Sequence, residues 1–421
     1  MIKYVRKRDG SKEEFSADKM QKWIELTATE GVNWSDLAFR AYRKLDDGCT
    51  SQDLHNAMVM ACLDIGTESS LKVAGKFFIS NLYKELFGGI KNIPTIKEFS
   101  KGLWEQMDYS DEDYEELEKV INHDKDFEYS YTTLRQMVDK YFIRSESGER
   151  GKVRETPQFM FMGIAMAAMA TMPKDRRLED VKKLYNLLSE LKINLPSPML
   201  SNLRTGLRGY ASCLTFMSDD TVESLGTGEH ISYMMTAKSA GIGGYIHSRS
   251  IGDSVRKGQV KHMGKLPLYR QIDAAVHAML QNGRGGASTI HYTCLDPEIL
   301  DLVNLKNPLT NSEKRIRGID YSFMYNNVFA KAVAKNEDWL LIGITQAPDL
   351  YEAFFSSDGD KFEEVYRKHL NSGKGKKIKA RELALTVLTQ SLETGRIYTT
   401  NIQEANRHTP FTETIYTSNL C

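Results

Sequence analysis

From Leu191 onward, the sequence alternates short apolar runs with helical patterns and glycine-rich turns. This order is typical of parallel strands joined by helical crossovers, because neighbouring parallel strands need a connection of a dozen or more residues. The run at 193–200 holds two prolines, which suits a strand end or an edge strand. Further strands are expected at 210–217, 339–344 and 396–402, and helices at 221–238, 267–281 and 380–393. The pattern predicts an α/β fold for this part of the chain.

The beginning of the chain has a different pattern, in which one hairpin is followed by helices. Alternating residues from 2 to 15 turn at Asp9-Gly10, a dipeptide that strongly favours a hairpin. Ser16 and Ser51 are candidate N-caps of two helices, and a further helix is expected to end at Phe87, before two glycines. The sequence therefore predicts a hairpin over a small helical bundle at 1–90.

The region at 91–192 is expected to be mainly helical, with one helix at 178–191. Its acidic stretch at 108–128 predicts a solvated helix face, and 140–155 predicts a polar hairpin around Ser147-Gly148. Thr156-Pro157 is a good start for a helix, and the apolar stretch that follows is too short to cross a bilayer. We expect a buried helix there and no membrane span.

Composition excludes several classes of protein. The 421 residues include 56 Lys and Arg against 56 Asp and Glu, so no overall positive field attracts long nucleic acids. The charged N-terminus is not followed by the apolar segment of a signal peptide. Five cysteines lie scattered, without a CxxC pair or a His/Cys cluster at metal-ligand spacing. We expect no bound metal, and reduced thiols at Cys49, Cys62 and Cys294 in a cytoplasmic protein.

Basic residues of the hairpin could bind phosphate. Lys7 and Arg8, with Lys19 and His55 nearby in the small bundle, could hold triphosphate oxygens through charge-assisted hydrogen bonds. The same charges could instead form a solvated face.

Two glycine-rich loops, at 240–244 and 281–286, could also let the backbone approach a phosphate closely. Arg249 and Arg256 follow the first loop, Arg284 lies in the second, and Asp219-Asp220 precedes both. Neither loop has the spacing of a Walker loop or of a dinucleotide fingerprint. Each could be a plain turn, but two such loops separated by one helix favour a shared ligand.

Two cysteines remain to be considered. Cys213 lies inside a predicted strand, where a cysteine is usually a small buried hydrophobe. Cys421 is the last residue of the sequence.

Several short motifs, taken in order, resemble the large (catalytic, alpha) subunit of class I ribonucleotide reductase in its aerobic bacterial and bacteriophage form. They are Val5-Arg-Lys-Arg-Asp-Gly10, Ser51-Gln-Asp-Leu-His55, Asn194-Leu-Pro-Ser-Pro-Met199, Ala211-Ser-Cys213, Ser239-Ala-Gly-Ile-Gly243, Arg284-Gly-Gly-Ala287, Thr394-Gly-Arg-Ile-Tyr398 and Ser418-Asn-Leu-Cys421. Each is weak alone, but their joint order is specific. The resemblance implies an ATP-cone at 1–90, a mainly helical region at 91–192, and the first half of a ten-stranded α/β barrel at 193–421 that ends in a finger loop.

An enzyme of this family reduces nucleoside diphosphates to deoxynucleoside diphosphates by thiyl-radical chemistry. The resemblance implies that Cys421, at the tip of the finger loop, becomes the thiyl radical. It also implies that Cys213 is one of two cysteines that reduce the substrate and that Asn419 hydrogen-bonds the ribose. Ser197 and Ser212 would contact the bound nucleoside diphosphate. Radical chemistry needs a dry, enclosed site, which a barrel core supplies.

The resemblance further implies two allosteric nucleotide sites. Asp220, Arg249, Arg256 and Arg284 match the region that binds deoxynucleoside triphosphate effectors at a dimer interface, and 281–286 is the connection to the substrate. ATP or dATP would bind in the cone through the residues that match its pattern: Val5, Lys7, Arg8, Glu13, Lys19, Ser51, His55 and Lys84.

Further partners follow from the same resemblance. A small subunit would generate the radical at its own metal centre, and a thioredoxin- or glutaredoxin-type protein would supply electrons. The family's catalytic glutamate, two residues beyond Cys421, and its second reducing cysteine are not in this sequence. We therefore expect a second polypeptide that carries the rest of the subunit, in the cytoplasm, or in the host cytoplasm if a phage encodes the chain.

Three alternatives stay open at this point. An intein or another interruption could follow Leu420 or Cys421, so that one spliced chain forms the enzyme. A non-catalytic nucleotide-binding regulator could use the cone and the effector loops alone. An anaerobic or glycyl-radical reductase shares the barrel, but the Ser-Asn-Leu-Cys string and the N-terminal match fit class I better.

Overall fold

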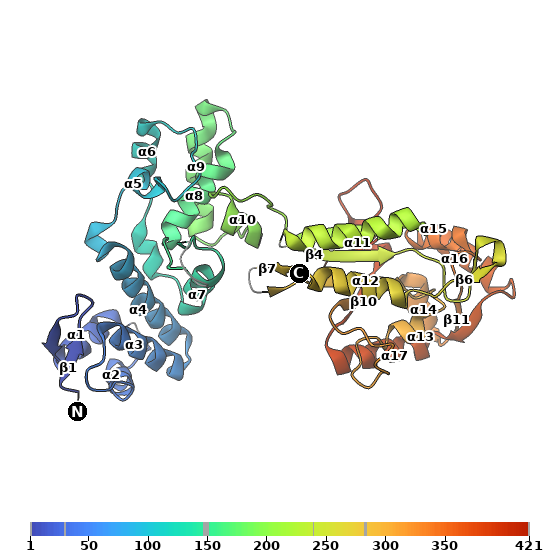
Figure 1. Cartoon of the computed structure of the whole chain (residues 1–421), viewed down its shortest axis with the longest axis horizontal. Coiled ribbons are helices and arrows are strands. Elements are labelled where there is room, and N and C mark those ends of the chain that lie inside the picture. Colours follow the sequence, from blue (N-terminus) through green and yellow to red (C-terminus); the bar gives the residue numbers. More distant parts are fainter. Residues whose placement is uncertain (1, 29–30, 146–150, 239, 282–283, 420–421) are drawn as a thin grey trace. The chain divides into compact units, whose positions relative to one another are not determined.

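The computed structural model describes residues 2–28, 31–145, 151–238, 240–281 and 284–419 (Figure 1). The chain divides into two compact units, 1–210 and 211–421. Among the described residues, buried apolar side chains form two clusters in the first unit and one in the second.

The first unit opens with an antiparallel hairpin and four helices. β1 (Tyr4–Arg6) pairs with β2 (Lys12–Glu14), and the turn between them places Gly10 at a φ of 85°, which glycine adopts without strain. The helices are α1 (Ala17–Thr27), α2 (Trp34–Tyr42), α3 (Ser51–Ile65) and α4 (Glu68–Phe87). Their apolar faces share one core, so the predicted hairpin and bundle are confirmed.

The helix ends in this bundle agree with the sequence in two cases out of three. Ser16 caps α1 by accepting a hydrogen bond from the Lys19 amide, and Gly88 ends α4 at a φ of 75°. The prediction that Ser51 caps a helix is wrong. Thr50 is the N-cap of α3, because its side chain and that of Asp53 form a capping box with the backbone.

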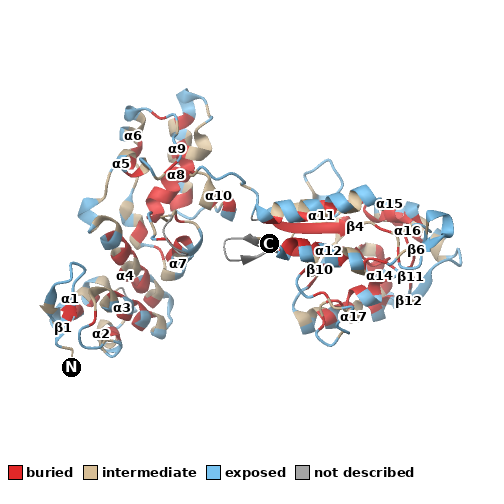
Figure 2. Ribbon diagram, in the orientation of Figure 1, coloured by how far each residue is buried: buried red, intermediate tan, exposed pale blue. Residues whose placement is uncertain are grey.

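The rest of the first unit is mainly helical. Its elements are η1 (Ile90–Asn92), α5 (Ile96–Ser100), α6 (Asp111–Glu118), η2 (His123–Phe127), α7 (Tyr131–Lys140), α8 (Pro157–Met169), α9 (Lys174–Ser189) and α10 (Ser197–Asn202). Helix α8 is buried from Pro157 to Met166 and lies at the centre of the second core (Figure 2). In the described part of the chain, no helix is long and apolar enough to cross a membrane.

The acidic stretch at 108–128 departs from the expected solvated face at Asp126, which is fully buried. Its carboxylate accepts hydrogen bonds from the Tyr83 hydroxyl at 2.7 Å and from Gln158 Nε2 at 2.9 Å. Burial raises the pKa of Asp126 to about 7, because a charge is costly away from water. This part of the stretch therefore belongs to the core, beside α4 and α8.

Helix α10 stands where the sequence predicted a strand end or an edge strand. Prolines 196 and 198 lie at its N-cap and in its first turn, where a fixed φ suits a helix and a missing N–H costs nothing. Just beyond it, the buried Arg204 donates through Nε to Glu155 Oε1 at 2.6 Å and through a terminal nitrogen to the Leu200 carbonyl at 2.6 Å. This buried ion pair fastens α10 to the helical core.

The second unit is built on a five-stranded parallel sheet with the order β13-β10-β9-β4-β3. The strands are β3 (Cys213–Ser218), β4 (Gly241–Ile246), β9 (Ser288–Thr293), β10 (Asp320–Tyr325) and β13 (Ile397–Asn401). All four neighbouring pairs are parallel. The predicted α/β class is confirmed, and the strands expected at 210–217 and 396–402 correspond to β3 and β13.

Helices join and flank these strands. They are α11 (Val222–Ala237), α12 (Leu266–His277), α13 (Ile299–Leu302), α14 (Asn327–Lys335), α15 (Pro348–Phe354), α16 (Gly359–Leu370), α17 (Ala380–Thr394) and α18 (Ile402–His408). Helices α11 and α12 lie side by side, α11 against β3 and β4 and α12 against β9 (Figure 1). The predicted helices at 221–238 and 380–393 are confirmed, whereas the one predicted at 267–281 ends at His277.

Three short pairs of antiparallel strands complete the second unit. They pair β5 (Ser254–Val255) with β6 (Val260–Lys261), β7 (Leu280–Gln281) with β8 (Arg284–Gly285), and β11 (Asp338–Leu341) with β12 (Lys376–Lys379). The turn η3 (Arg256–Gly258) lies at the tip of the first. The strand predicted at 339–344 is therefore β11, which pairs with β12 and lies outside the parallel sheet.

The two faces of the parallel sheet differ in character. Side chains that are paired in register point to the same face, because direction alternates along each strand. The row that joins Phe216, Ile290 and Tyr321 is apolar, and Tyr321 stacks on Tyr269 of α12. The opposite face, which we call the inner face, carries the small and polar residues Thr215, Gly243, Thr289, His291 and Ser322, together with Met217, Tyr245 and Met324.

Candidate functional site

Residues 415–419, which we call the finger segment, run across the inner face of the sheet. The Asn419 side chain donates from Nδ2 to the Gly241 carbonyl at 2.7 Å. The Ser418 carbonyl oxygen lies 2.0 Å from the position that a Cβ atom would take on Gly243, so only glycine leaves room for this crossing. Asn419 is thereby fixed at the start of β4.

His291 of β9 holds the finger segment from a second strand. Its Nδ1 lies 2.9 Å from Thr417 Oγ1 and its Nε2 lies 3.2 Å from Ser418 Oγ. The side chain is fully buried, and burial lowers the pKa of His291 to about 4, so the imidazole is neutral at pH 7. His291 was not predicted from the sequence, because it belongs to no recognisable motif and stands within a buried strand.

The entry of the finger segment is fixed by Asn406 of α18. Its Oδ1 accepts a hydrogen bond from the Ile415 amide at 2.7 Å, and its Nδ2 donates to the Ile415 carbonyl at 2.9 Å. The next residue, Tyr416, packs its ring against Phe355 with centroids 4.9 Å apart. One asparagine side chain thus replaces the backbone partner that a neighbouring strand would supply.

Cys213 begins β3 beside this crossing. It is the register partner of Gly241, whose amide donates to the Ser212 carbonyl at 2.7 Å. The Ser212 hydroxyl lies 3.7 Å from the Cys213 sulfur, and Cys213 is not a free thiol in the structure. The structure therefore brings three predicted residues together, Asn419, Ser212 and Cys213, through Gly241.

Two other predicted residues are Ser197 and Cys421. Ser197 is exposed in the first turn of α10, in the first unit, where its carbonyl accepts a hydrogen bond from Ser201. Cys421 lies outside the described residues. The remaining cysteines, Cys49, Cys62 and Cys294, are buried free thiols, as expected, and burial raises the pKa of Cys62 to about 12.

Asp220 and Arg249, both predicted to bind an effector, are joined by hydrogen bonds from the backbone and from the side chain of Arg249. Arg249 donates through Nε to Asp220 Oδ2 at 2.7 Å, and its backbone amide donates to Oδ1 at 3.1 Å. Arg256 is exposed at the tip of the β5–β6 hairpin with a φ of 49°, and Lys257 beside it has a φ of 58°. Two cations thus occupy strained backbone positions, which are uncommon for residues other than glycine.

The loop predicted at 281–286 forms the β7–β8 hairpin, in which Gln281 pairs with Arg284. Residues 282–283 and the Arg284 side chain lie outside what the structure describes. Gly286 follows the hairpin against α12, where a Cβ atom would lie 2.0 Å from the Val276 carbonyl oxygen. The chain directly after this hairpin therefore packs against α12.

A buried ionic cluster ties the 249–265 segment to the residues that follow β9. Lys265 Nζ lies 2.9 Å from Asp296 Oδ2 and 3.8 Å from Glu298 Oε1, and all three side chains are buried. Glu298 also accepts hydrogen bonds from the backbone amides of Ile251 and Lys265. Both ends of the segment that carries Arg249 and Arg256 are held by this cluster, which the sequence analysis missed.

The predicted nucleotide residues of the hairpin line a pocket of about 140 Å³ in the first unit. Its floor is apolar and includes Val5 and Trp23, and its rim is charged. Glu13 pairs with Lys7 at 2.5 Å and with Lys19 at 2.7 Å. Hydrogen bonds from these two lysines lower the pKa of Glu13 to about 2. The pocket thus combines an apolar surface with two ammonium groups.

His55 and Lys84 both contact Trp23, which lines that pocket. The Trp23 ring packs against the His55 ring at 4.5 Å, and Lys84 Nζ lies 4.8 Å from the indole centroid. Arg8 donates to Asn81 of α4. Burial, with Lys84 and Arg8 close by, lowers the pKa of His55 to about 3, and burial with Arg8 and Lys7 lowers the pKa of Lys84.

The positive charges of Arg8, Lys7 and Lys84 disfavour one another, and an anion bound beside them would offset this repulsion. Ser51 lies in the first turn of α3. Trp23 was not selected from the sequence, although it stands one helical turn after Lys19 on α1.

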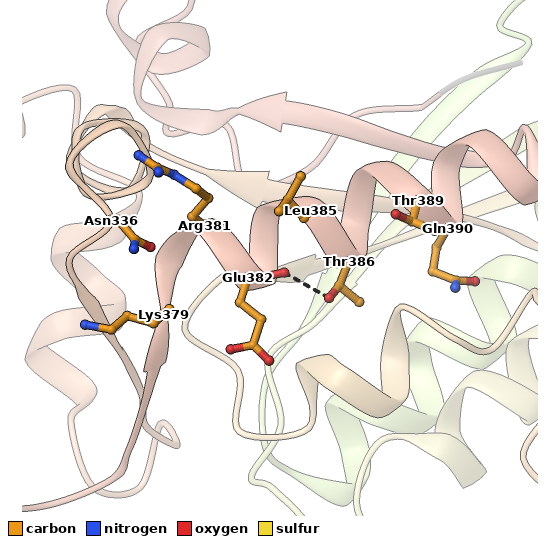
Figure 3. Close-up of a pocket in the computed structure, with 8 residues that line it drawn as sticks. All are labelled: Asn336, Lys379, Arg381, Glu382, Leu385, Thr386, Thr389 and Gln390. Carbon is orange, nitrogen blue, oxygen red and sulfur yellow. Dashed lines mark hydrogen bonds between the residues drawn. The ribbon is translucent and has the colours of Figure 1, made fainter.

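A larger pocket, of about 530 Å³, lies on α17, and no predicted site residue lines it (Figure 3). Across the described residues, no group of three or more His, Cys, Asp or Glu side chains could hold a metal ion.

Comparison with known proteins gives the family. Two family models match: "Ribonucleotide reductase, barrel domain" at 211–421 and "Ribonucleotide reductase, all-alpha domain" at 127–208. Ribonucleoside-diphosphate reductase 1 subunit alpha of Escherichia coli (strain K12) is 30% identical over 438 residues, which cover 99% of this chain and 57% of the relative. The subunit alpha of Enterobacteria phage T4 is 32% identical over 440 residues, with the same coverage of both.

The subunit alpha of Haemophilus influenzae (strain ATCC 51907 / DSM 11121 / KW20 / Rd) is 30% identical over 440 residues. The chain spans about 57% of the length of these curated relatives. Since the barrel-domain model covers half of the chain, and the all-alpha model and the relatives agree with it, the chain belongs to the class I ribonucleotide reductase large-subunit (alpha) family.

Proposed function

We propose that this chain forms part of a ribonucleoside-diphosphate reductase and carries the half of its substrate site that lies on the inner face of the sheet. The observation that carries this proposal is the crossing of the finger segment. Asn419 is bonded to Gly241, the register partner of Cys213. A ribose held by Asn419 would therefore lie beside the sulfur that the reaction needs.

In the proposed reaction, the Cys421 thiyl radical takes the 3′ hydrogen of a nucleoside diphosphate and returns it at the end. In the reduced protein, the Cys213 thiol gives its proton to the 2′-hydroxyl, which leaves as water. Cys213 and a second cysteine, outside this sequence, supply two electrons and become a disulfide, and the hydrogen of the second thiol replaces the hydroxyl at C2′. A thioredoxin- or glutaredoxin-type protein then reduces that disulfide. Ser197 and Ser212 are proposed to contact the substrate.

The first unit is proposed to bind ATP or dATP as an ATP-cone at 1–90. Its support is the pocket lined by Lys7 and Lys19, together with Lys84 and the neutral His55 against Trp23. Arg8, which is bonded to Asn81, is the further cation of the proposed site. Phosphate oxygens would neutralise cations that now repel one another. Val5, Glu13 and Ser51 complete the proposed site.

A second allosteric site is proposed at Asp220, Arg249, Arg256 and Arg284, for deoxynucleoside triphosphates. Its support is the ion pair between Asp220 and Arg249. Arg256 lies farther along the same segment, at the exposed tip of the β5–β6 hairpin. In the family this site lies at a dimer interface, so we also propose dimerisation of the large subunit.

The activity of the whole enzyme requires the part of the family's length that this sequence does not match. We propose that a complementary C-terminal large-subunit polypeptide supplies it and that a small subunit generates the radical, in the cytoplasm or in a phage-infected host's cytoplasm. The test combines the chain, that polypeptide and the small subunit in a CDP reduction assay with effector. Turnover that needs all three proteins is expected. Turnover by the chain and small subunit alone would refute the need for a complementary polypeptide.

A non-catalytic nucleotide-binding regulator is the second candidate. It is favoured by the cone pocket and the Asp220–Arg249 pair, because residues of this chain form both. Binding of ATP or of deoxynucleoside triphosphates, with no CDP reduction in any combination of proteins, would favour this role over the reductase.

A further inference from the structure

The side chain of His291 is the feature of the inner face to which the family assignment gives no role. It is fully buried, it stands on the central strand β9, and it contacts two consecutive hydroxyl groups of a segment more than 120 residues away in sequence, Thr417 and Ser418. A buried imidazole is costly unless both of its nitrogens have partners. Here both have them.

The chemistry of these contacts suits a fixed support. A neutral imidazole has one donor and one acceptor nitrogen, and a hydroxyl can act as either, so both hydrogen bonds form with either tautomer. The Ser418 carbonyl oxygen rests against Gly243, and Asn419 is bonded to Gly241. The finger segment is thus held at three places on two neighbouring strands.

We propose that His291 is a positioning residue of the reductase site. It fixes Thr417 and Ser418 against the inner face, and through them it sets the place of Asn419. This inference rests on the proposed function. His291 does not act as a proton donor or acceptor toward substrate, because protein hydroxyls occupy both ring nitrogens and the side chain is not accessible.

The geometry predicts how much activity depends on this support. Without the imidazole, two of the contacts that hold Thr417 and Ser418 are lost, while the contact at Gly241 remains. A misplacement of reacting groups by about 1 Å can cost about 100-fold in rate. We therefore expect His291→Phe, which keeps a ring of similar size, to lower kcat for CDP reduction by about 100-fold. Effector binding should not change.

Conservative variants distinguish positioning from simple packing. His291→Gln can still bond one hydroxyl and should recover about tenfold in kcat over His291→Phe. Thr417→Val removes one hydroxyl at nearly constant volume and should cost about tenfold. In the double variant His291→Phe/Thr417→Val, the Thr417 change should add little to the loss that His291→Phe causes alone. The Thr417 hydroxyl has then already lost its contact with the imidazole. His408→Gln, whose side chain is 73% exposed on α18, is the matched control and should leave kcat unchanged.

Hydrogen exchange of the amides at 415–419 gives a readout that does not need turnover. We expect His291→Phe to speed exchange there at least tenfold, with exchange in β4 and α12 unchanged. If His291→Phe showed the same exchange rates at 415–419 as the wild type, or the same kcat, the proposal would be overturned. If the wild-type protein itself shows no CDP reduction, the proposed function fails, and the exchange measurement still decides whether His291 positions the segment.

Discussion

Substitution of Gly243 tests the crossing of the finger segment most directly. An alanine Cβ at this position would lie 2.0 Å from the Ser418 carbonyl oxygen and 3.0 Å from the Asn419 Cα. Since Cβ atoms essentially never come within 3.0 Å of such an oxygen, the segment must move by at least about 1 Å. The hydrogen bond from Asn419 Nδ2 to the Gly241 carbonyl, now 2.7 Å, would then lengthen beyond its useful range.

The expected loss follows from that displacement. One broken hydrogen bond costs only about 1 kcal/mol of stability, so Gly243→Ala should still fold. A displacement of about 1 Å at the reacting groups is expected to lower kcat about 100-fold. The measurement is CDP reduction by the chain with the complementary polypeptide and the small subunit, with far-ultraviolet circular dichroism to show that the fold is kept.

Gly206→Ala is the matched control, because a Cβ there meets no atom within 4 Å. It should leave kcat and stability near those of the wild type. Wild-type kcat in a folded Gly243→Ala protein would refute the reasoning, since the finger segment would then not need its present path. An unfolded Gly243→Ala protein would also contradict it, because the calculated cost is local.

Three further predictions concern other parts of the chain. Lys265→Met leaves Asp296 and Glu298 buried without their cation, so it should lower the free energy of unfolding by about 3–5 kcal/mol, read as a lower urea midpoint. Asp126→Asn should gain stability relative to the wild type as pH rises from about 4 to 7. Over that range the folded wild type holds a proton that its unfolded state has lost, and the difference should grow by up to about 1.4 kcal/mol per pH unit in pH-dependent unfolding. Lys84→Met should weaken ATP binding to the first unit about tenfold by calorimetry. Lys72→Met, on the same helix but paired with Glu68, should not, and equal losses in both would count against the cone site.

Local patterns predicted the elements whose sequence signals are local. The Asp9-Gly10 turn, the Gly88 helix end and the strands β3 and β13 follow from residue types and spacing alone. The mistake at Ser51 was avoidable, because Thr50 and Asp53 have the three-residue spacing of a capping box. The prolines at 196 and 198 were ambiguous, since proline suits both a strand edge and a first helical turn.

The candidate site depended on contacts that no local pattern reveals. His291 meets Thr417 and Ser418 only because β9 lies in the middle of the sheet, and Asp126 is buried only because the chain folds back on α8. The family resemblance selected Asn419, Ser212 and Cys213, which the structure brings together around Gly241. Their catalytic roles, like those of the effector and cone residues, stay predictions for the assays above.

The two hydrogen bonds between Asn406 and Ile415 make the position of the finger segment independent of the loop at 409–414 that precedes it. The backbone N–H and C=O of Ile415 are both hydrogen-bonded to the Asn406 side chain of α18. The position of the finger segment therefore does not depend on the conformation of the loop between Asn406 and Ile415. Insertions, deletions and sequence drift in that loop can therefore accumulate without displacing Asn419. A peptide tag or a fluorescent label placed at Glu413 would report on this region while leaving the inner face as it is.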